Sequence, residues 1–192
     1  MKTKFFTGEG DSGESSVGDK KISKSSALAE FLGSLDELNS WIGLCRVKAE
    51  EKKLYNDTSK TLREIQESLF ILQAEVAGIG FQYEKHPQLQ EEKIKELEKV
   101  IEAIDLVLPK LEKFIIVGGV ELSAHLDVAR TIARRTERFA KRYSDESFDS
   151  TQDKSELPKP LLQYLNRLSS VLFALARHVN FQAGIKEEHP KY

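Results

Sequence analysis

The sequence predicts an all-α protein folded as a bundle of five helices. Five separate stretches carry apolar residues at intervals of three to four, and no stretch shows the sustained alternation of a half-buried strand. At 192 residues and 40% hydrophobic content, the chain is long enough for a single domain with a sizeable core. Because each amphipathic helix must bury its apolar stripe against another element, an up-and-down bundle is the simplest arrangement.

The first three predicted helices occupy the first half of the chain. The first follows the candidate N-cap residues Ser25 and Ser26, and its apolar stripe is Leu28, Phe31, Leu32, Leu35, Leu38, Ile42 and Cys45. The second is expected from about Thr58 to Gly80, with the stripe Leu62, Ile65, Leu69, Leu72 and Val76. Pro87 opens the third and Pro109 stops it, with Ile94, Leu97, Ile101, Ile104 and Leu108 between them.

The last two helices are separated by a long polar segment. The fourth helix is expected to start after Gly118 and Gly119 and to continue to about Tyr143, and the fifth follows residues 158–160 (PKP) to about Ala183. Residues 144–157 (SDESFDSTQDKSEL) are polar and without periodicity, which predicts a mobile loop. The chain thus divides into an irregular N-terminal segment (1–24), the bundle (25–183) and a C-terminal tail (184–192).

Composition excludes several classes of partner. The 29 basic and 31 acidic residues give a net charge of −2, so no global field favours nucleic acid or anionic lipid. No segment approaches about 18 uninterrupted apolar residues, and the N-terminus lacks the apolar run of a signal peptide, so neither membrane spanning nor secretion is expected. The single cysteine, Cys45, cannot form an intramolecular disulfide, which favours a cytoplasmic location.

A charged stripe lies along the predicted fourth helix. At 100° per residue its members fall within an arc of about 100°; they are Asp127, Arg130, Arg134, Glu137, Arg138 and Lys141. Periodicity alone favours a solvated face of the bundle. Arginines spaced four apart repel each other, however, unless acids or a bound anion offset them, and their planar forks suit phosphate oxygens. The alternative interpretation is therefore an anion-binding wall.

Other candidate residues allow a structural and a functional interpretation. Residues 7–16 (TGEGDSGESS) can cradle an anion through free backbone amides or be a flexible tail, and they lack the lysine-serine end of a Walker loop. Asp36 and Asn39 lie on the polar side of the first helix, and Asn166-Arg167 interrupt the apolar stripe of the fifth. Polar groups at such places in a bundle usually make structural hydrogen bonds. The apolar segment 114–119 (FIIVGG) is expected to plug the end of the bundle. Glu121 and His125, with no third ligand, are expected at the surface rather than on a metal.

Six segments, taken together, resemble the PduO-type ATP:cob(I)alamin adenosyltransferases. They are TGEGDSGESS, Lys24, AEFLGSLDELNSWIG, FIIVGG, VARTIARRTER and YLNRLSSVLFALAR, in the family's order and spacing. The likeness spans about residues 3–183 and implies a five-helix bundle assembled as a homotrimer, with active sites between neighbouring subunits. The implied activity is transfer of the 5′-deoxyadenosyl group of ATP to cob(I)alamin, giving adenosylcobalamin and triphosphate.

The resemblance also assigns residues to the two substrates. ATP, with Mg²⁺ bound mainly through it, would be held by Thr7, Gly10, Asp11, Ser15, Ser16, Lys24, Arg134, Arg135, Glu137, Arg138 and Asn166. Asp36 and Arg130 match a salt-bridged pair that supports the corrinoid across the subunit interface. Phe114 matches the phenylalanine that displaces the lower axial base of cobalamin and leaves four-coordinate cob(II)alamin, which a flavin-type or other reductase then reduces.

This implied chemistry agrees with the residues present, because a nucleophile supplied by cobalt needs no Ser-His or Cys-His arrangement from the protein. The protein must align C5′ with cobalt and neutralise the charge on the leaving triphosphate, as Arg134 and Lys24 can do.

The chain also departs from the family pattern at Glu9, Ser12, Ser25, Ser26, Leu28, Val117 and Ser170. These departures keep open a weakly active carrier or sensor of nucleotide or cobalamin. A helical scaffold is the third class, but it would not need this combination of residues.

Overall fold

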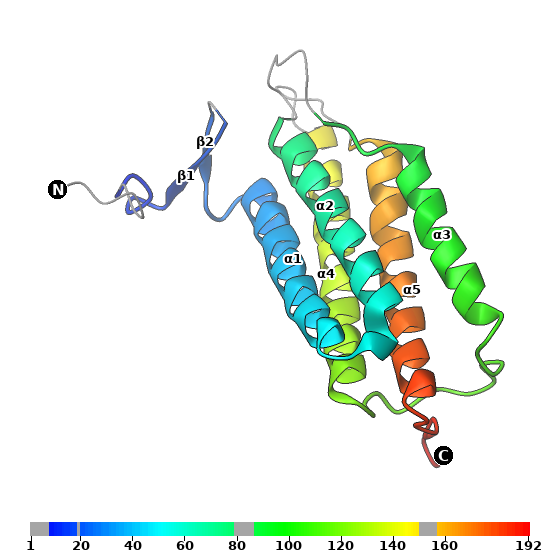
Figure 1. Ribbon diagram of the computed structural model, residues 1–192. Coiled ribbons are helices and arrows are strands. Elements are labelled where there is room, and N and C mark those ends of the chain that lie inside the picture. Colours follow the sequence, from blue (N-terminus) through cyan, green and yellow to red (C-terminus); the bar gives the residue numbers. More distant parts are fainter. Residues whose placement is uncertain (1–7, 19, 79–86, 150–156) are drawn as a thin grey trace.

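The computed structural model describes residues 8–18, 20–78, 87–149 and 157–192. Five long helices lie side by side in a bundle, and a two-stranded hairpin stands off to one side at its N-terminal end (Figure 1). The elements are β1 (Glu14–Val17), β2 (Lys20–Ser23), α1 (Ala27–Glu50), the short 3-10 helix η1 (Lys53–Tyr55), α2 (Asn56–Gly78), α3 (Glu91–Asp105), α4 (Glu121–Asp149) and α5 (Lys159–Gln182). The prediction of a five-helix bundle is confirmed.

The predicted apolar stripes form one core. Helix α4 packs against α1 and α5, α2 packs on α1, and α3 covers the outer side of α5. Phe31, Leu35 and Leu38 of α1 are fully buried, as are Leu165 and Leu168 of α5. Buried hydroxyls tie the same helices together, since the Ser123 hydroxyl of α4 donates to Ala176 O of α5 over 2.9 Å. Each such bond satisfies a polar group that burial would otherwise penalise.

Helix boundaries follow the predicted signals at most ends. The Ser26 hydroxyl caps α1 by accepting a hydrogen bond from Ala29 N over 3.2 Å. Helix α5 has Pro160 in its first turn and ends one residue before Ala183. Helix α3 begins at Glu91 rather than Pro87. Leu89 N donates to the buried Glu75 carboxylate over 3.0 Å, and this bond holds residues 87–90 outside the helix.

Helix α4 is longer than predicted. It continues to Asp149 instead of ending near Tyr143, so the predicted loop 144–157 is helical over its first six residues. No glycine or proline stops the helix here, and ion pairs four residues apart support it, with Arg142 Nε 2.8 Å from Glu146 Oε1 and Lys141 paired with Asp145. The remainder of the predicted loop, residues 150–156, lies outside the described residues.

The sequence predicted an irregular N-terminal segment, but this segment contains a β-hairpin. β1 and β2 pair antiparallel, with Glu14 opposite Ser23 and Val17 opposite Lys20. This register leaves a two-residue connection that begins with Gly18, whose φ of 58° suits the tight turns of short hairpins. In the sequence, the Gly-Asp pair at 18–19 is a signal for a hairpin turn. The flanking strands are too short to show a clear alternation of apolar and polar residues, so periodicity did not indicate the hairpin.

Candidate functional site

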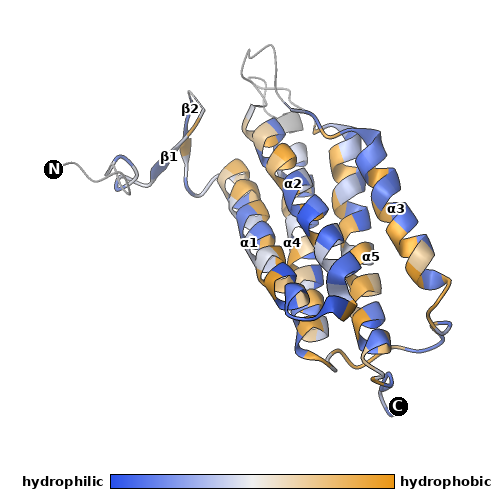
Figure 2. Ribbon diagram, viewed as in Figure 1, coloured by the Kyte–Doolittle hydropathy of each residue, from blue (hydrophilic) through white to orange (hydrophobic). Residues whose placement is uncertain are grey.

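An open cavity of about 390 Å³ lies between the α3–α4 connection and the surfaces of α4 and α5. It brings together three of the predicted site residues, Phe114, Arg130 and Arg134. Its remaining apolar lining comes mainly from the connection and from Phe173 of α5, and much of the connection is coloured as hydrophobic in Figure 2. The cavity therefore joins an apolar wall to a wall with two guanidinium groups, as a ligand with both apolar and anionic parts requires.

The two arginines of this cavity differ in their partners. Arg130 Nε donates to Asp127 Oδ1 over 3.0 Å, and its guanidinium carbon lies 5.9 Å from the centre of the Phe173 ring. Arg134 makes no hydrogen bond or ion pair through its side chain within the part of the chain that the structure describes. Arg130 is therefore held in place by its neighbours, whereas the charge of Arg134 is available to an anion.

The rest of the charged stripe is largely paired. Arg138 Nη1 donates to Arg134 O over 3.1 Å, and Arg135, beside the stripe, pairs with Glu37 of α1. Glu137 accepts a hydrogen bond from Asn166 Nδ2 over 2.8 Å. The stripe is therefore neither a simple solvated face nor a continuous anion-binding wall.

Asn166 belongs to a hydrogen-bond network across three helices. Arg167 Nη1 donates to Asn166 Oδ1 over 3.0 Å, and Arg167 Nε donates to Glu98 Oε1 of α3 over 2.9 Å. Together with the bond to Glu137, these contacts set the orientation of the Asn166 amide. Asn166 and Arg167 thus make the structural hydrogen bonds that the sequence favours, and one of these bonds joins Asn166 to Glu137, which is also a candidate ATP residue.

The apolar segment 114–119 does not plug the bundle end. Phe114 is 78% exposed, and Ile116 and Val117 are also more than half exposed. The segment is held through its glycine end instead, where Asn180 Nδ2 of α5 donates to Gly118 O over 2.8 Å and Asn180 Oδ1 accepts from Val120 N over 3.0 Å. A Cβ on Gly119 would lie 2.2 Å from Asn180 Oδ1, and its φ of 98° disfavours other residues.

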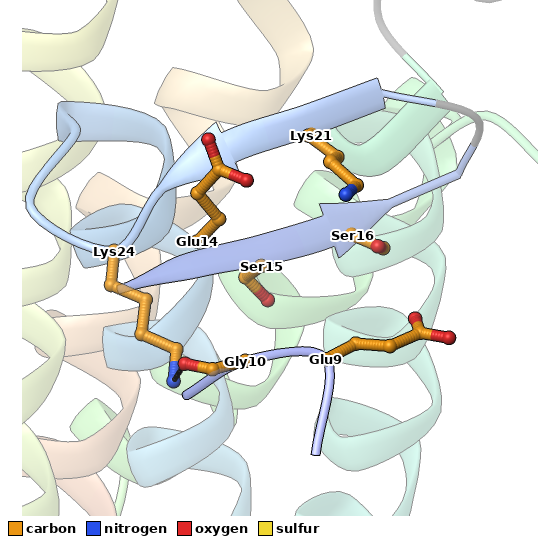
Figure 3. A pocket seen from close by; sticks show the side chains of 7 residues that line it. All are labelled: Glu9, Gly10, Glu14, Ser15, Ser16, Lys21 and Lys24. Carbon is orange, nitrogen blue, oxygen red and sulfur yellow. Dashed lines mark hydrogen bonds between the residues drawn. The ribbon is translucent and has the colours of Figure 1, made fainter. Parts of the chain in front are cut away.

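A second cavity, of about 230 Å³, lies within the N-terminal segment (Figure 3). Among the predicted ATP residues, Gly10, Ser15, Ser16 and Lys24 line it, and Lys24 Nζ donates to Gly10 O over 2.7 Å. Asp11 does not line it, and Thr7 lies outside the described residues. Glu9, one of the departures from the family pattern, does line it and adds negative charge.

One chain does not bring all the predicted residues together. The N-terminal cavity is lined only by residues 9–24, and the other cavity contains none of them. Asp36 is exposed and makes no ion pair among the described residues, so within one chain it does not join Arg130, whose partner is Asp127 three residues away on the same helix. The residues assigned to ATP therefore form two groups in the single subunit.

No cluster of three or more potential metal ligands from His, Cys, Asp and Glu occurs in the part of the chain that the structure describes. Glu121 Oε1 lies 3.6 Å from His125 Nε2, and Glu121 Oε2 lies 3.4 Å from Lys48 Nζ, so the pair forms part of a charged surface cluster. Cys45 is buried, which raises the pKa of its thiol to about 12 and keeps it protonated at neutral pH. No helix among the described residues is long and apolar enough to cross a membrane.

Several functional candidates were missed in the sequence. In the sequence Asp127 is only one member of the charged stripe, whereas in the structure it is buried and orients Arg130. Phe173 and Ser169 line the cavity from α5, beside Ser170, which the sequence marks as a departure from the family pattern. Arg177 and Asn180 of α5 contact the α3–α4 connection. For Arg177 the sequence offered one signal, because a charged residue inside the apolar stripe of α5 indicates a buried polar contact.

Comparisons with known proteins indicate one family for the chain. The profile of the cobalamin adenosyltransferase family matches residues 5–179. The corrinoid adenosyltransferase of Bacillus subtilis is 35% identical over 95% of this chain and 89% of its own length, and the cobalamin adenosyltransferase of Cupriavidus metallidurans is 34% identical over 95% and 91%.

Solved structures agree as well. A variant PduO-type ATP:corrinoid adenosyltransferase from Lactobacillus reuteri, complexed with cobalamin and ATP, superposes with a TM-score of 0.88 at 28% identity, covering 98% of this chain and 100% of that chain. Another variant of that enzyme, complexed with ATP, gives a TM-score of 0.86 at 29% identity, covering 97% and 100%. From its sequence and its fold, this chain belongs to the cobalamin adenosyltransferase family.

Proposed function

We propose that this protein transfers the 5′-deoxyadenosyl group of ATP to cob(I)alamin, giving adenosylcobalamin and triphosphate. The observation that carries the proposal is the cavity that contains both an exposed phenylalanine, Phe114, and Arg134, whose guanidinium has no partner among the described residues. The apolar ring of Phe114 suits the face of a corrin, and the positive charge of Arg134 suits a polyphosphate. The names of the relatives and the ligands of the Lactobacillus reuteri complexes support the same reaction.

The reaction divides the work between substrate and protein. The electron pair of cob(I)alamin forms the cobalt–carbon bond at C5′ of ATP, while the C5′–oxygen bond breaks and triphosphate leaves with its pair. Arg134 would neutralise charge that grows on the triphosphate, assisted by Arg138 and Lys24. Arg130, held by Asp127, would support the corrinoid, and Phe114 would displace its lower base.

Mg²⁺ is proposed to bind mainly through the ATP phosphates, because the described residues contain no cluster of acidic or histidine ligands that would hold it alone. A flavin-type or other reductase as the source of electrons, and a cytoplasmic location, remain predictions. Neither depends on the geometry of the cavity.

A product assay tests the proposed function. The protein is incubated anaerobically with MgATP and chemically reduced cobalamin, and adenosylcobalamin and triphosphate are followed by absorbance and chromatography. Both products are expected in equal amounts, with none when EDTA replaces Mg²⁺. Binding of the substrates without product would favour a nucleotide or corrinoid carrier. Absence of binding to either substrate would contradict both functions.

The active site is further proposed to lie between subunits of a homotrimer. Two observations support this, the separation of the two cavities within one chain and the exposed apolar side chains of Leu44, Val47 and Val128 on the adjacent helices α1 and α4. Asp36 of one subunit would then meet Arg130 of its neighbour.

Turnover per subunit is therefore expected to fall when dilution separates the subunits. Turnover and mass in solution are to be measured over the same dilution series. Turnover that stays constant while the mass falls to that of one chain would contradict a shared site.

A further inference from the structure

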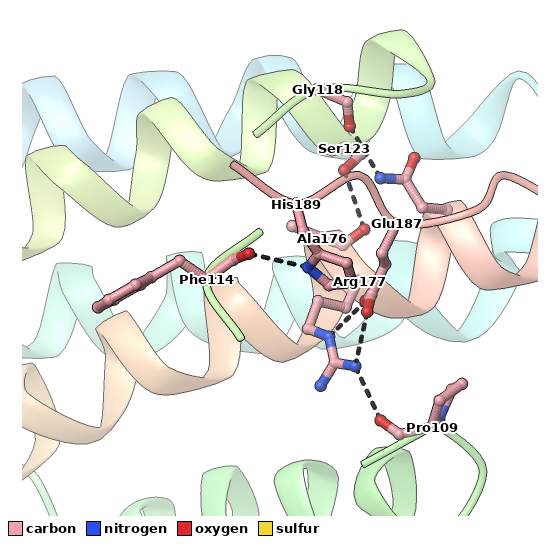
Figure 4. Close-up of polar contacts among 9 residues, drawn as sticks. Pro109, Phe114, Gly118, Ser123, Ala176, Arg177, Glu187 and His189 are labelled. Carbon is pink, nitrogen blue, oxygen red and sulfur yellow. Dashed lines mark hydrogen bonds and ion pairs between the residues drawn. The ribbon is translucent and has the colours of Figure 1, made fainter. Parts of the chain in front are cut away.

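The C-terminal tail of the chain contacts the α3–α4 connection, which carries Phe114 (Figure 4). After α5 the chain turns back at Gly184, where Ile185 N donates to Asn180 O over 2.9 Å. Residues 185–189, here called the C-terminal strap, contain no helix or strand. They nevertheless contact the connection at several atoms, so the strap has a defined place in the fold.

The first anchor of the strap is a partly buried ion pair. Arg177 of α5 is 9% exposed, and it donates to Glu187 through Nε to Oε1 at 2.6 Å and through Nη2 to Oε2 at 3.1 Å. The same Nη2 donates to Pro109 O over 2.9 Å, at the start of the connection. A two-pronged bond with little solvent screening is among the stronger side-chain contacts, so Arg177 joins the helix, the strap and the connection.

The second anchor consists of two hydrogen bonds around Phe114. Ile116 N donates to Glu188 O over 2.8 Å, and His189 Nδ1 lies 2.9 Å from Phe114 O, where the ring nitrogen must be the donor because a carbonyl only accepts. The Phe114 side chain is largely exposed and so does not fix itself by packing. Its backbone position therefore depends on these strap contacts together with the hydrogen bonds of Asn180 to Gly118 and Val120.

We propose that the C-terminal strap is a positioning element for the corrinoid site, which sets Phe114 at the height needed to displace the lower axial base. The proposal rests on the proposed function of Phe114. Glu187 acts through the strap and lines neither the N-terminal cavity nor the cavity that contains Phe114. Because the strap stabilises the connection before any substrate binds, the phenylalanine is preorganised, and less of the corrinoid binding energy is spent on ordering it.

The test compares Glu187→Ala with Glu188→Ala. Both variants remove one negative charge from adjacent strap residues, but Glu188 holds the connection only through its backbone carbonyl, which the substitution keeps. Two quantities are measured in each. They are the hydrogen-exchange rate of the Ile116 amide without substrates, and the fraction of cob(II)alamin that loses its lower base with MgATP present, followed by electron paramagnetic resonance. Arg177→Ala is avoided, because Arg177 also donates to Pro109 O, so its loss would release the connection directly and not only through the strap.

In Glu187→Ala, the Ile116 amide is expected to exchange about tenfold faster and the base-free fraction to fall by about the same factor, as for the loss of a charge-assisted hydrogen bond. Glu188→Ala is expected to match the unchanged protein in both. MgATP affinity is expected to stay the same in both variants.

Unchanged Ile116 exchange in Glu187→Ala would show that the strap does not hold the connection. Faster exchange with an unchanged base-free fraction would overturn the positioning role. Phe114→Ala is measured alongside to test the role of Phe114 itself. A lower base-free fraction in Phe114→Ala shows that Phe114 displaces the base, so an unchanged fraction in Glu187→Ala then counts against the strap alone.

Discussion

Arg134→Ala is expected to lower the rate of adenosylcobalamin formation by about a hundredfold to a thousandfold, the usual effect of removing one donor from a site where charge develops. Arg134 lies in the cavity with Phe114, and its guanidinium has no partner among the described residues. Its loss removes no ion pair from the fold, so the helical circular dichroism and the melting temperature are expected to remain unchanged. The triphosphate leaving group is then left with less neutralising charge.

Two further variants sharpen this test. Arg63→Ala removes the same charge from an exposed position of α2, where Arg63 pairs with Glu67 four residues on, and it is expected to leave turnover unchanged. Arg134→Lys keeps the charge but loses the planar fork, so its turnover should lie between those of the alanine variant and the unchanged protein. Turnover of Arg134→Ala equal to that of Arg63→Ala would remove Arg134 from the mechanism.

The helices could be predicted because their signals are local. The stripe containing Phe31, Leu35 and Leu38 marks the buried face of α1, and the cap at Ser26 marks its start. The predicted end of α4 was wrong because residues 144–157 are polar and lack apolar periodicity, although residues 141–146 carry charges at helical spacing. The hairpin was missed because two strands of four residues are too short to show a period.

The site was harder to predict because much of it depends on backbone atoms and on long-range neighbours. Sequence separates Phe114 from Arg134 by 20 positions, and only the packing of the α3–α4 connection near α4 brings them to one cavity. The strap binds through the carbonyls of Phe114 and Glu188, whose chemistry is common to every residue. Family resemblance identified Arg130, but its buried partner Asp127 emerged from the structure.

Phe114→Ala is expected to abolish most base displacement while leaving the fold intact. Burial of a phenylalanine against an apolar surface is worth about 1.5–3 kcal/mol, so the base-free fraction of bound cob(II)alamin should fall by about ten- to a hundredfold. The side chain is largely exposed in the single chain, so its removal should change the free energy of unfolding by no more than about 0.5 kcal/mol. Electron paramagnetic resonance measures the base-free fraction, and thermal unfolding checks the fold.

The route by which cobalt is reduced separates a redox role of Phe114 from a simple binding role. With cob(II)alamin and a mild reductant, Phe114→Ala should slow product formation in proportion to the lost base-free fraction. With cobalamin already reduced to cob(I), base displacement is no longer required, so the loss should be much smaller. Phe70→Ala, which removes an exposed ring from α2, is the matched control and should affect neither route. Equal losses by both routes would mean that Phe114 only binds the corrinoid.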